Sequence, residues 1–157
     1  MNNDFPCYCG YGQPFSVCCL PLITGEQQAA TPQALMRSRY SAYAGKYFQY
    51  VLATYALTQR TLLTLNDIEK DAGATKWLRL EILDSNMGQD TGEVEFNAFY
   101  QFDKQLFKIH ERSQFCRQDG YWRYTTGKIH GDSGPYQQRR NDECLCASGK
   151  KFKKCCL

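Results

Sequence analysis

Two short cysteine-rich segments at opposite ends of the chain constrain its fold more than any other feature. Shifting the sequence by 137 positions places residues 7–20 on residues 144–157, and seven of the 14 aligned positions are identical. Both copies have the frame C-x-C, eight further residues, then C-C. A unit this short has almost no apolar core, so we expect each segment to be organised by a bound metal ion.

The spacing favours zinc held by four thiolates in each segment. Structural zinc sites are tetrahedral, and cysteines at i and i+2 of an extended turn can bind one ion from the same side. Gly12 and Gly149 let the intervening residues turn back, and the closing Cys-Cys pair can supply two ligands from the first turn of a short helix. The predicted ligands of two zinc ions are Cys7, Cys9, Cys18 and Cys19, and Cys144, Cys146, Cys155 and Cys156.

Disulfides and iron–sulfur clusters are the alternatives for these cysteines. Disulfide scaffolds are typical of exported proteins, and the N-terminal sequence lacks the basic and apolar parts of a secretory signal. Vicinal cysteines suit a compact zinc site better than a cluster, but both alternatives stay open. The ninth cysteine, Cys116, stands alone and is expected to be a small side chain in a strand.

No apolar run approaches the ~18–20 residues of a membrane-spanning helix, which excludes an integral membrane protein. We therefore expect a soluble, cytoplasmic protein. Its net charge is +3, and residues 137–157 contribute +4 of it. Four thiolates around one Zn²⁺ would reduce that local charge to +2, which disfavours duplex DNA as a partner. A protein or ribosomal partner remains open for the four lysines of this segment, Lys150, Lys151, Lys153 and Lys154.

The segment from Cys144 to Cys156 resembles the SEC-C zinc motif, named after the C-terminus of the SecA translocase. A copy at each end, around a middle segment with LMRSRY at 35–40 and ERSQF at 111–115, resembles the YchJ-like bacterial family. The resemblance implies a middle domain of the nuclear-transport-factor-2-like (NTF2-like) fold, a cone in which a curved sheet and helices enclose a pocket. It also supports Cys156 as a ligand, because the motif has cysteine or histidine there.

The middle of the chain reads as helices followed by strands. Thr31 is a good N-cap, Gly45 is expected to divide the first helical region in two, and Thr64 opens a third, short helix with Asp67 at capping-box spacing. The first helix has an apolar face of Met36, Tyr40, Tyr43 and Tyr47.

Alternating apolar residues predict antiparallel strands within 78–82, 94–102, 106–116 and 122–126, with a hairpin turn at 118–121. This order indicates an α+β fold, with helices packed on a curved antiparallel sheet. We expect a zinc knuckle, a short segment organised by its metal ion, at 1–25, a middle domain at 26–136 and a second zinc knuckle at 137–157. Gly131–Pro135 reads as the linker at the boundary before the C-terminal knuckle, and residues 137–142 continue polar, so that knuckle should be the more mobile one. The N-terminal knuckle can dock through Leu20, Leu22 and Ile23.

Glu111 is the polar residue of most interest in the middle segment. The period of two places it on the core-facing side of its strand, where a carboxylate requires a partner or takes up a proton. The expected partner is Arg39 or Arg37, on the helix that carries Tyr40. The alternative is that Glu111 lies in a pocket and binds a ligand or acts as an acid or base.

Catalytic motifs are scarce. Strand alternation sends His110 to the face opposite Glu111, and His130 falls in the glycine-rich linker. The sequence has no nucleophile–base pair, glycine-rich phosphate loop or metalloprotease motif. We therefore favour a recognition or adapter protein whose basic C-terminal knuckle contacts its partner. The alternative is binding of a small apolar molecule, or isomerase- or dehydratase-like chemistry, in the central pocket.

Overall fold

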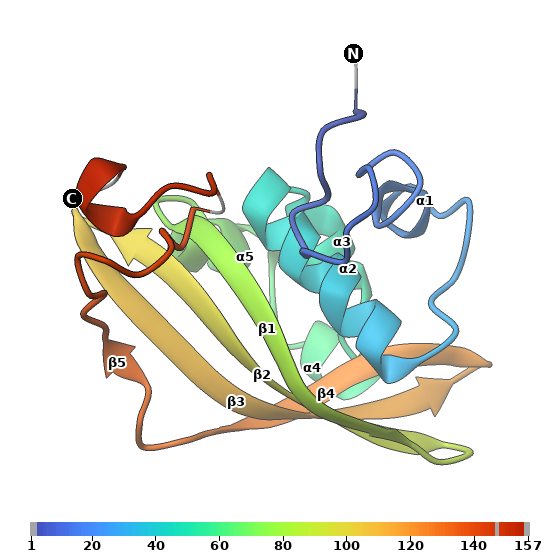
Figure 1. The fold of residues 1–157 in the computed structure, drawn as a ribbon. Helices are drawn as coiled ribbons and strands as arrows, with labels where there is room; N and C mark the ends of the chain where they lie inside the picture. Colours follow the sequence, from blue (N-terminus) through green and yellow to red (C-terminus); the bar gives the residue numbers. More distant parts are fainter. Residues whose placement is uncertain (1–2, 147, 156–157) are drawn as a thin grey trace.

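The computed structural model describes residues 3–146 and 148–155 of the chain (Figure 1). One layer is an antiparallel sheet in the order β1-β2-β3-β4, with the short β5 pairing with β3. The strands are β1 (Lys76–Met87), β2 (Thr91–Phe102), β3 (Gln105–Gln118), β4 (Tyr121–Ile129) and β5 (Gly134–Pro135). The helices are α1 (Leu20–Ile23), α2 (Pro32–Gly45), α3 (Phe48–Ala53), α4 (Leu57–Arg60) and α5 (Leu65–Ala72), and a 3₁₀ turn, η1, spans Phe152–Lys154.

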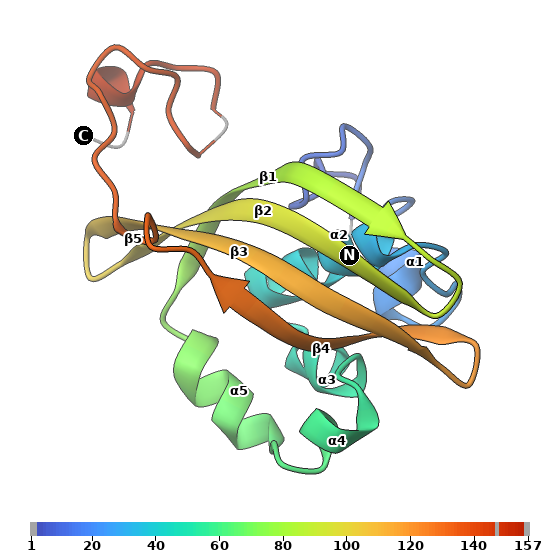
Figure 2. The ribbon, with the colours of Figure 1, turned by 90° about the horizontal axis from the view of Figure 1, so that it is seen from below.

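The sheet curves beneath α2, and the helices lie on one of its faces (Figures 1 and 2). Its inner face carries Val94, Phe96 and Ala98 of β2, which are buried in one cluster with Leu35 and Tyr40 of α2. The same cluster includes residues of the N-terminal segment, which therefore shares the core of the middle segment. The α+β fold with helices on a curved antiparallel sheet is confirmed.

The ends of the helices follow the expected local chemistry. The Thr31 hydroxyl accepts a hydrogen bond from the Ala34 N–H at 3.0 Å, and α2 ends at Gly45, followed by Lys46 at φ 66°. Thr64 and Asp67 form a complete capping box at the start of α5. The short helix expected at the closing Cys-Cys pair of the N-terminal segment is α1, whose N-cap is Cys19. The sequence pattern did not predict the four-residue helix α4, because an element of one turn carries no helical repeat.

The β3–β4 hairpin is also confirmed. Asp119 and Gly120 connect its strands with φ values of 53° and 84°, the double positive φ of a type I′ turn.

The segment expected to be a linker, Gly131–Pro135, is not an unpaired connection, because part of it pairs with the sheet. β4 pairs with β3 only as far as Ile129 opposite Glu111, so the first part of β3 has an open edge. Gly134 and Pro135 pair with that edge, and the Tyr136 N–H donates to the Leu106 carbonyl at 2.9 Å. Unpaired backbone groups on the edge of a sheet are a ready template for another strand, and here the chain itself supplies it.

Among the described residues, no helix combines the length and the apolar character needed to cross a bilayer.

Candidate metal centres and the central cavity

The two terminal segments share a set of backbone hydrogen bonds at equivalent positions. The Cys7 N–H donates to the Gln13 carbonyl at 2.9 Å, and 137 residues later Cys144 donates to Lys150 at 2.8 Å. The Phe15 N–H donates to the Phe5 carbonyl at 2.9 Å, and the Phe152 N–H donates to the Asp142 carbonyl at 2.8 Å. Gly12 and Gly149, at φ 95° and 79°, make the equivalent turn in each copy. The sequence repeat is therefore a structural repeat, and we call residues 3–20 and 140–155 the N-terminal and C-terminal knuckles.

The N-terminal knuckle gathers four thiols around one point. The sulfur atoms of Cys7, Cys9, Cys18 and Cys19 all lie within 4.8 Å of one another. Cys9 Sγ lies 3.6 Å from Cys18 Sγ, and Cys18 Sγ lies 4.0 Å from Cys19 Sγ. Four sulfurs at about 2.3 Å from a tetrahedral zinc ion are about 3.8 Å apart. The four thiols thus match the size and donor set of a thiolate zinc site, and none of them is in a disulfide.

The pKa values of these thiols are shifted in opposite directions. Hydrogen bonds from Cys19 and Cys9 hold the pKa of Cys7 far below its ordinary value, and the hydrogen bond to Cys7 raises the pKa of Cys19. Burial and the nearby Cys9 raise the pKa of Cys18 to about 12. Four thiols this close cannot all ionise without a cation, because each thiolate opposes the next. A bound divalent ion would supply that charge.

The C-terminal knuckle brings together Cys144, Cys146 and Cys155, whose sulfurs also lie within 4.8 Å of one another. Cys146 Sγ and Cys155 Sγ are 3.3 Å apart, and a hydrogen bond with Ser148 lowers the pKa of Cys146 to about 6. The fourth predicted ligand, Cys156, lies outside the described residues. The three described thiols can hold a metal ion by themselves or with a fourth donor.

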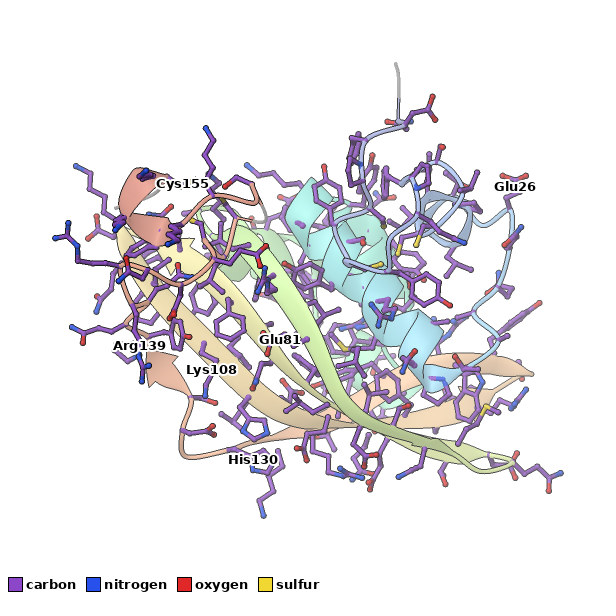
Figure 3. The ribbon with its side chains drawn as sticks, in the orientation of Figure 1. Glu26, Glu81, Lys108, His130, Arg139 and Cys155 are labelled. Carbon is purple, nitrogen blue, oxygen red and sulfur yellow. The ribbon has the colours of Figure 1, made fainter. Side chains whose placement is uncertain are left out.

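The knuckles differ in their surroundings. In the N-terminal knuckle, Cys9 and Phe15 are fully buried, and Arg37 of α2 donates to the Cys9 carbonyl at 3.0 Å. The C-terminal knuckle lies beyond the start of β1, away from α2, and its Cys155 is exposed (Figure 3). An Arg79–Glu143 ion pair of 3.7 Å links it to β1. Its four lysines, Lys150, Lys151, Lys153 and Lys154, are all exposed.

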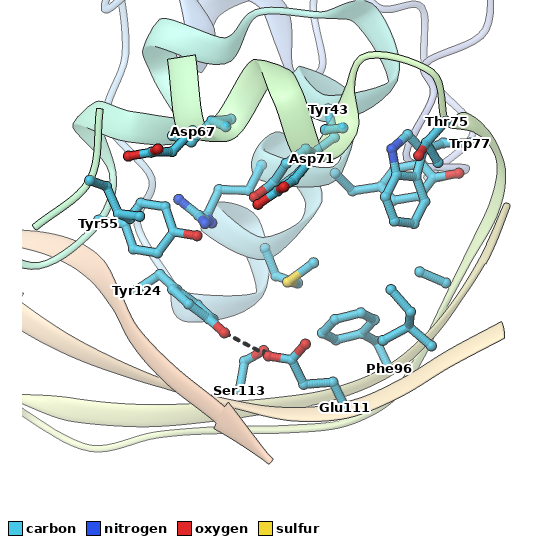
Figure 4. Close-up of a pocket in the computed structure, with 18 residues that line it drawn as sticks. Tyr43, Tyr55, Asp67, Asp71, Thr75, Trp77, Phe96, Glu111, Ser113 and Tyr124 are labelled. Atoms are coloured by element: carbon cyan, nitrogen blue, oxygen red, sulfur yellow. Dashed lines mark hydrogen bonds between the residues drawn. The ribbon is translucent and has the colours of Figure 1, made fainter. Parts of the chain in front are cut away.

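A cavity of about 290 Å³ lies between the inner face of the sheet and the helices (Figure 4). Aromatic side chains of α2, β1 and β4 line it, with Asp67 and Asp71 of α5 on one side and Glu111 on the sheet. Glu111 accepts hydrogen bonds from the Tyr124 hydroxyl at 2.7 Å and from Ser113 Oγ at 3.0 Å. Burial, and then the Glu111 charge, raise the pKa of Tyr124, so its hydroxyl stays a donor.

The expected ion pair between Glu111 and an arginine is wrong. Arg39 is 3% exposed and donates instead to the Val51 carbonyl at 2.8 Å and to Thr54 Oγ1 at 2.6 Å. Arg37 instead donates to the Cys9 carbonyl of the N-terminal knuckle. The sheet supplies the partners of Glu111 from neighbouring positions, so the carboxylate is satisfied without a guanidinium. The expectation that Glu111 faces the interior holds, since it lines the cavity together with Arg39 and Tyr40.

Both the middle segment and the C-terminal cysteine segment match known families. The sequence matches the family model described as "YchJ, middle NTF2-like domain" over residues 31–127 and the SEC-C motif over residues 140–157. A UPF0225 protein of Vibrio cholerae is 38% identical over 152 residues, covering 96% of this chain and 98% of that protein. The chain belongs to the YchJ family, UPF0225.

Other members and solved structures agree with this assignment. A UPF0225 protein of Photorhabdus laumondii is 40% identical over 156 residues, covering 96% of this chain and 97% of its own. The solution structure of a SEC-C motif containing protein from Rhodopseudomonas palustris has a TM-score of 0.75 and 36% identity, and covers 79% of this chain and 98% of its own. A crystal structure of such a protein from Psychrobacter arcticus has a TM-score of 0.69 and 27% identity, covering 96% and 93%.

Sequence reasoning missed one group of polar residues in this family member. His130 does not lie in a free linker; its ring stacks on that of His110, with ring centroids 4.1 Å apart. Both rings lie near Glu95 on the outer face of the sheet. Alternation along β3 predicts that His110 points outward, but no sequence pattern indicates that the chain after β4 folds back against it.

Proposed function

We propose that this protein is a zinc-dependent recognition protein with one zinc ion in each knuckle and a docking surface on the C-terminal knuckle. The proposed ligands are the four cysteines of each segment, Cys7, Cys9, Cys18 and Cys19, and Cys144, Cys146, Cys155 and Cys156. The observation that carries the proposal is the repeat itself: one backbone is used twice, once buried against the core and once exposed with four lysines.

Burial of the N-terminal knuckle gives it a structural role, because its fully buried Phe15 extends the core of the middle segment. The C-terminal knuckle contributes little to that core. Where it carries Lys150, Lys151, Lys153 and Lys154, the N-terminal copy has Gln13, Pro14, Ser16 and Val17. A basic surface presented on a metal-stabilised knuckle suits an acidic partner, either a protein surface or the ribosome.

Elemental analysis of untagged protein purified under reducing conditions tests the metal content. We expect two zinc ions per chain, falling to one in Cys9→Ser and to one in Cys155→Ser. Cys116→Ser is the matched control, since Cys116 lies on β3 outside both knuckles, and it should keep two. Protein without zinc, or with thiols paired in disulfides, would contradict this part of the proposal.

The docking surface is tested by giving the C-terminal knuckle the residues of the N-terminal one: Lys150→Gln, Lys151→Pro, Lys153→Ser and Lys154→Val together. The N-terminal copy shows that the backbone accepts these residues, and Lys151 already has the φ of −67° that proline requires. We expect co-sedimentation with purified ribosomes, or capture of an acidic partner protein, to fall about tenfold or more and to depend on salt.

The matched control neutralises four exposed lysines elsewhere, Lys70, Lys76, Lys104 and Lys128, by glutamine. This variant has the same change in net charge, so it should bind as the unchanged protein does. Equal binding by all three proteins would show that the lysines of the C-terminal knuckle do not form the docking surface.

Binding of a small molecule in the central cavity is the second candidate function. It is favoured by the position of Glu111, whose carboxylate is held by Tyr124 and Ser113 at the edge of the cavity. A thermal-shift screen of the full chain with small organic compounds tests it, since a ligand present at 100 times its Kd stabilises by about 2.7 kcal/mol. A true cavity ligand should stabilise the four-lysine variant equally and Glu111→Gln much less.

A further inference from the structure

The outer face of the sheet carries a cluster that neither the knuckles nor the cavity uses. Phe96 and Glu111 face the cavity, so their neighbours Glu95 on β2 and His110 on β3 point to the opposite side. His130, directly after β4, lies on that side of the sheet, away from α2 (Figure 3). One ligand atom from each of Glu95, His110 and His130 can be chosen so that all three lie within 4.8 Å of one another.

The segment after β4 is built around His110. The His130 N–H donates to the His110 carbonyl at 2.8 Å, and the His110 N–H donates to Ser133 Oγ at 2.8 Å. The Asp132 carboxylate accepts from His110 Nδ1 at 2.7 Å. Residues 130–133 thus contact the backbone and the ring of one strand residue, and they fix His130 and Asp132 around it.

The contact with Asp132 determines what His110 offers on its other side. A carboxylate only accepts, so Nδ1 carries the hydrogen, and a neutral ring then presents the lone pair of Nε2. That nitrogen faces Glu95 Oε2 at 3.2 Å. A lone pair and a carboxylate oxygen repel unless a cation or a proton lies between them. Metal-binding histidines commonly donate one ring N–H to a carboxylate and bind the metal through the other nitrogen. His110 has this arrangement, with Asp132 on Nδ1 and Glu95 facing Nε2.

His130 has a nitrogen without a partner. Its Nε2 is buried and makes no hydrogen bond within the described part of the chain, and Glu95 Oε1 is 3.9 Å away. The two imidazole planes are within 11° of parallel, so one ion cannot lie in both planes as they stand. His130 follows the end of β4 and its side chain is 33% exposed, so its ring is the one that can rotate toward the ion.

The charges around the cluster also leave room for a divalent cation. Lys108 binds Asp132 at 2.9 Å, and Arg112 contacts Glu95 at 3.2 Å while its Nε binds Glu93 at 2.6 Å and its Nη2 binds Asp84 at 3.2 Å. This connected network holds four carboxylates, two permanent cations and the two imidazoles. With neutral imidazoles its net charge is −2, which one divalent ion would balance.

We propose that Glu95, His110 and His130 bind a divalent transition-metal ion, with Asp132 orienting His110 from behind. Two imidazoles and one carboxylate are a donor set that suits Zn²⁺, and ligand distances of about 2.0–2.2 Å place the donors about 3.2–3.5 Å apart. The separation of His110 Nε2 from Glu95 already meets this value, and rotation of the His130 ring out of the stack would complete the set. Three protein ligands leave a coordination position open to water on the outer face of the sheet.

The two histidines are the only ones in the chain, so their ring signals report on this site alone. We would take untagged, ¹⁵N-labelled protein with its knuckles loaded with zinc, remove free metal, and titrate ZnCl₂ at constant pH while recording the imidazole nitrogens by NMR. We expect both rings to change together and to saturate at one further equivalent. The signals of both knuckles should stay unchanged, which separates this site from the proposed zinc knuckles.

Variants define the ligands. Glu95→Gln and His130→Gln should each weaken zinc binding by more than 100-fold, and Asp132→Asn by about 10–100-fold, as is typical of outer partners. Glu93→Gln is the matched control, because it removes a carboxylate from the same strand and face that does not contact either histidine. Circular dichroism and thermal unfolding check that each variant is folded.

The proposal fails if excess Zn²⁺ leaves both rings unchanged, since the position between His110 and Glu95 then holds only a proton. It also fails if only one ring responds, or if Glu95→Gln binds zinc as tightly as Glu93→Gln does.

Discussion

Because Gly127 has no side chain, the Glu111 carboxylate can take its position in the cavity wall. Gly127 lies on β4 beside Glu111, and a Cβ built at this residue would overlap the carboxylate itself. The space that glycine leaves therefore lets the carboxylate lie flat against the sheet and accept from Tyr124 and Ser113. Glycine is needed here for close approach rather than for a special backbone conformation.

Gly127→Ala should destabilise the protein by about 1–3 kcal/mol, because the added methyl group must push the Glu111 side chain out of its hydrogen bonds. Urea unfolding measures the change. In the Glu111→Ala background the same substitution should be nearly neutral, since nothing remains to be displaced. Gly131→Ala is the control: its Cβ would meet no atom within 4 Å. Equal losses in both backgrounds would show that Gly127 does not position Glu111.

Arg39 is a buried cation that forms no ion pair with any carboxylate in the described part of the chain. Its guanidinium lies over the rings of Tyr55 and Tyr124, 4.5 Å and 4.7 Å from their centroids, and donates to Val51 and Thr54. A planar, weakly hydrated cation suits such a position because it can stack and donate at the same time. The aromatic rings, the Val51 carbonyl and the Thr54 hydroxyl thus take the place of the anion that the sequence predicted.

Arg39→Lys should cost about 1–3 kcal/mol in the free energy of unfolding, because lysine keeps the charge but loses the stacking and the in-plane hydrogen bonds. Urea unfolding again provides the measurement. Arg117→Lys, which changes an exposed guanidinium 4.5 Å from the Trp122 ring centroid, should cost only about 0.5–1 kcal/mol. If Arg39→Lys is as mild as this control, the charge alone stabilises the site.

At the scale of elements, α2 connects the N-terminal knuckle to the cavity. Toward the knuckle, Arg37 donates to the Cys9 carbonyl, and Ser41 Oγ lies 3.5 Å from Cys7 Sγ. Toward the cavity, the same helix contributes Arg39 and Tyr40 to the lining. Its start is fixed by the Thr31 cap and the following proline. A change at the N-terminus of α2 therefore affects both sites.

Thr31→Ala should destabilise the protein by about 1 kcal/mol, because the Ala34 N–H loses its acceptor. Thr31→Ser keeps the oxygen and should retain most of that stability. Unfolding in urea, followed by tryptophan fluorescence, distinguishes the two. A loss as large in Thr31→Ser would point to packing of the threonine methyl group rather than to the cap.

The sequence predicted those elements whose cause is local. The caps at Thr31 and Thr64, the turn at Asp119 and the two knuckles depend on residues a few positions apart, and each is present. The partners of Glu111 and Arg39, the pairing of β5 and the stacking of His130 on His110 depend on contacts between distant segments. Such contacts follow from how strands end and which edges stay open, and periodicity carries no information about that.

At the scale of the whole molecule, one knuckle fold is attached in two ways. The N-terminal copy is continuous with the core, because Cys7, Cys9, Phe15 and Cys19 are buried in the same cluster as Trp122. The C-terminal copy has buried residues of its own, Cys144 and Leu145, outside that cluster. The greater mobility expected of the C-terminal knuckle remains a prediction, which faster amide exchange at residues 140–155 would support.

This difference predicts that losing metal at the two ends has unequal consequences. Cys9→Ser should lower the stability of the whole domain by at least about 2–3 kcal/mol, since Phe15 loses its place in the core and a buried phenylalanine contributes roughly that much. Cys155→Ser should change it by less than about 0.5 kcal/mol, in the range of surface substitutions. Both tryptophans, Trp77 and Trp122, lie in the middle segment and pack in its core, so their fluorescence during urea unfolding follows the loss of that core. Similar losses in the two variants would mean that the C-terminal knuckle supports the core as the N-terminal one does, and would remove the reason to regard it as a surface free for a partner.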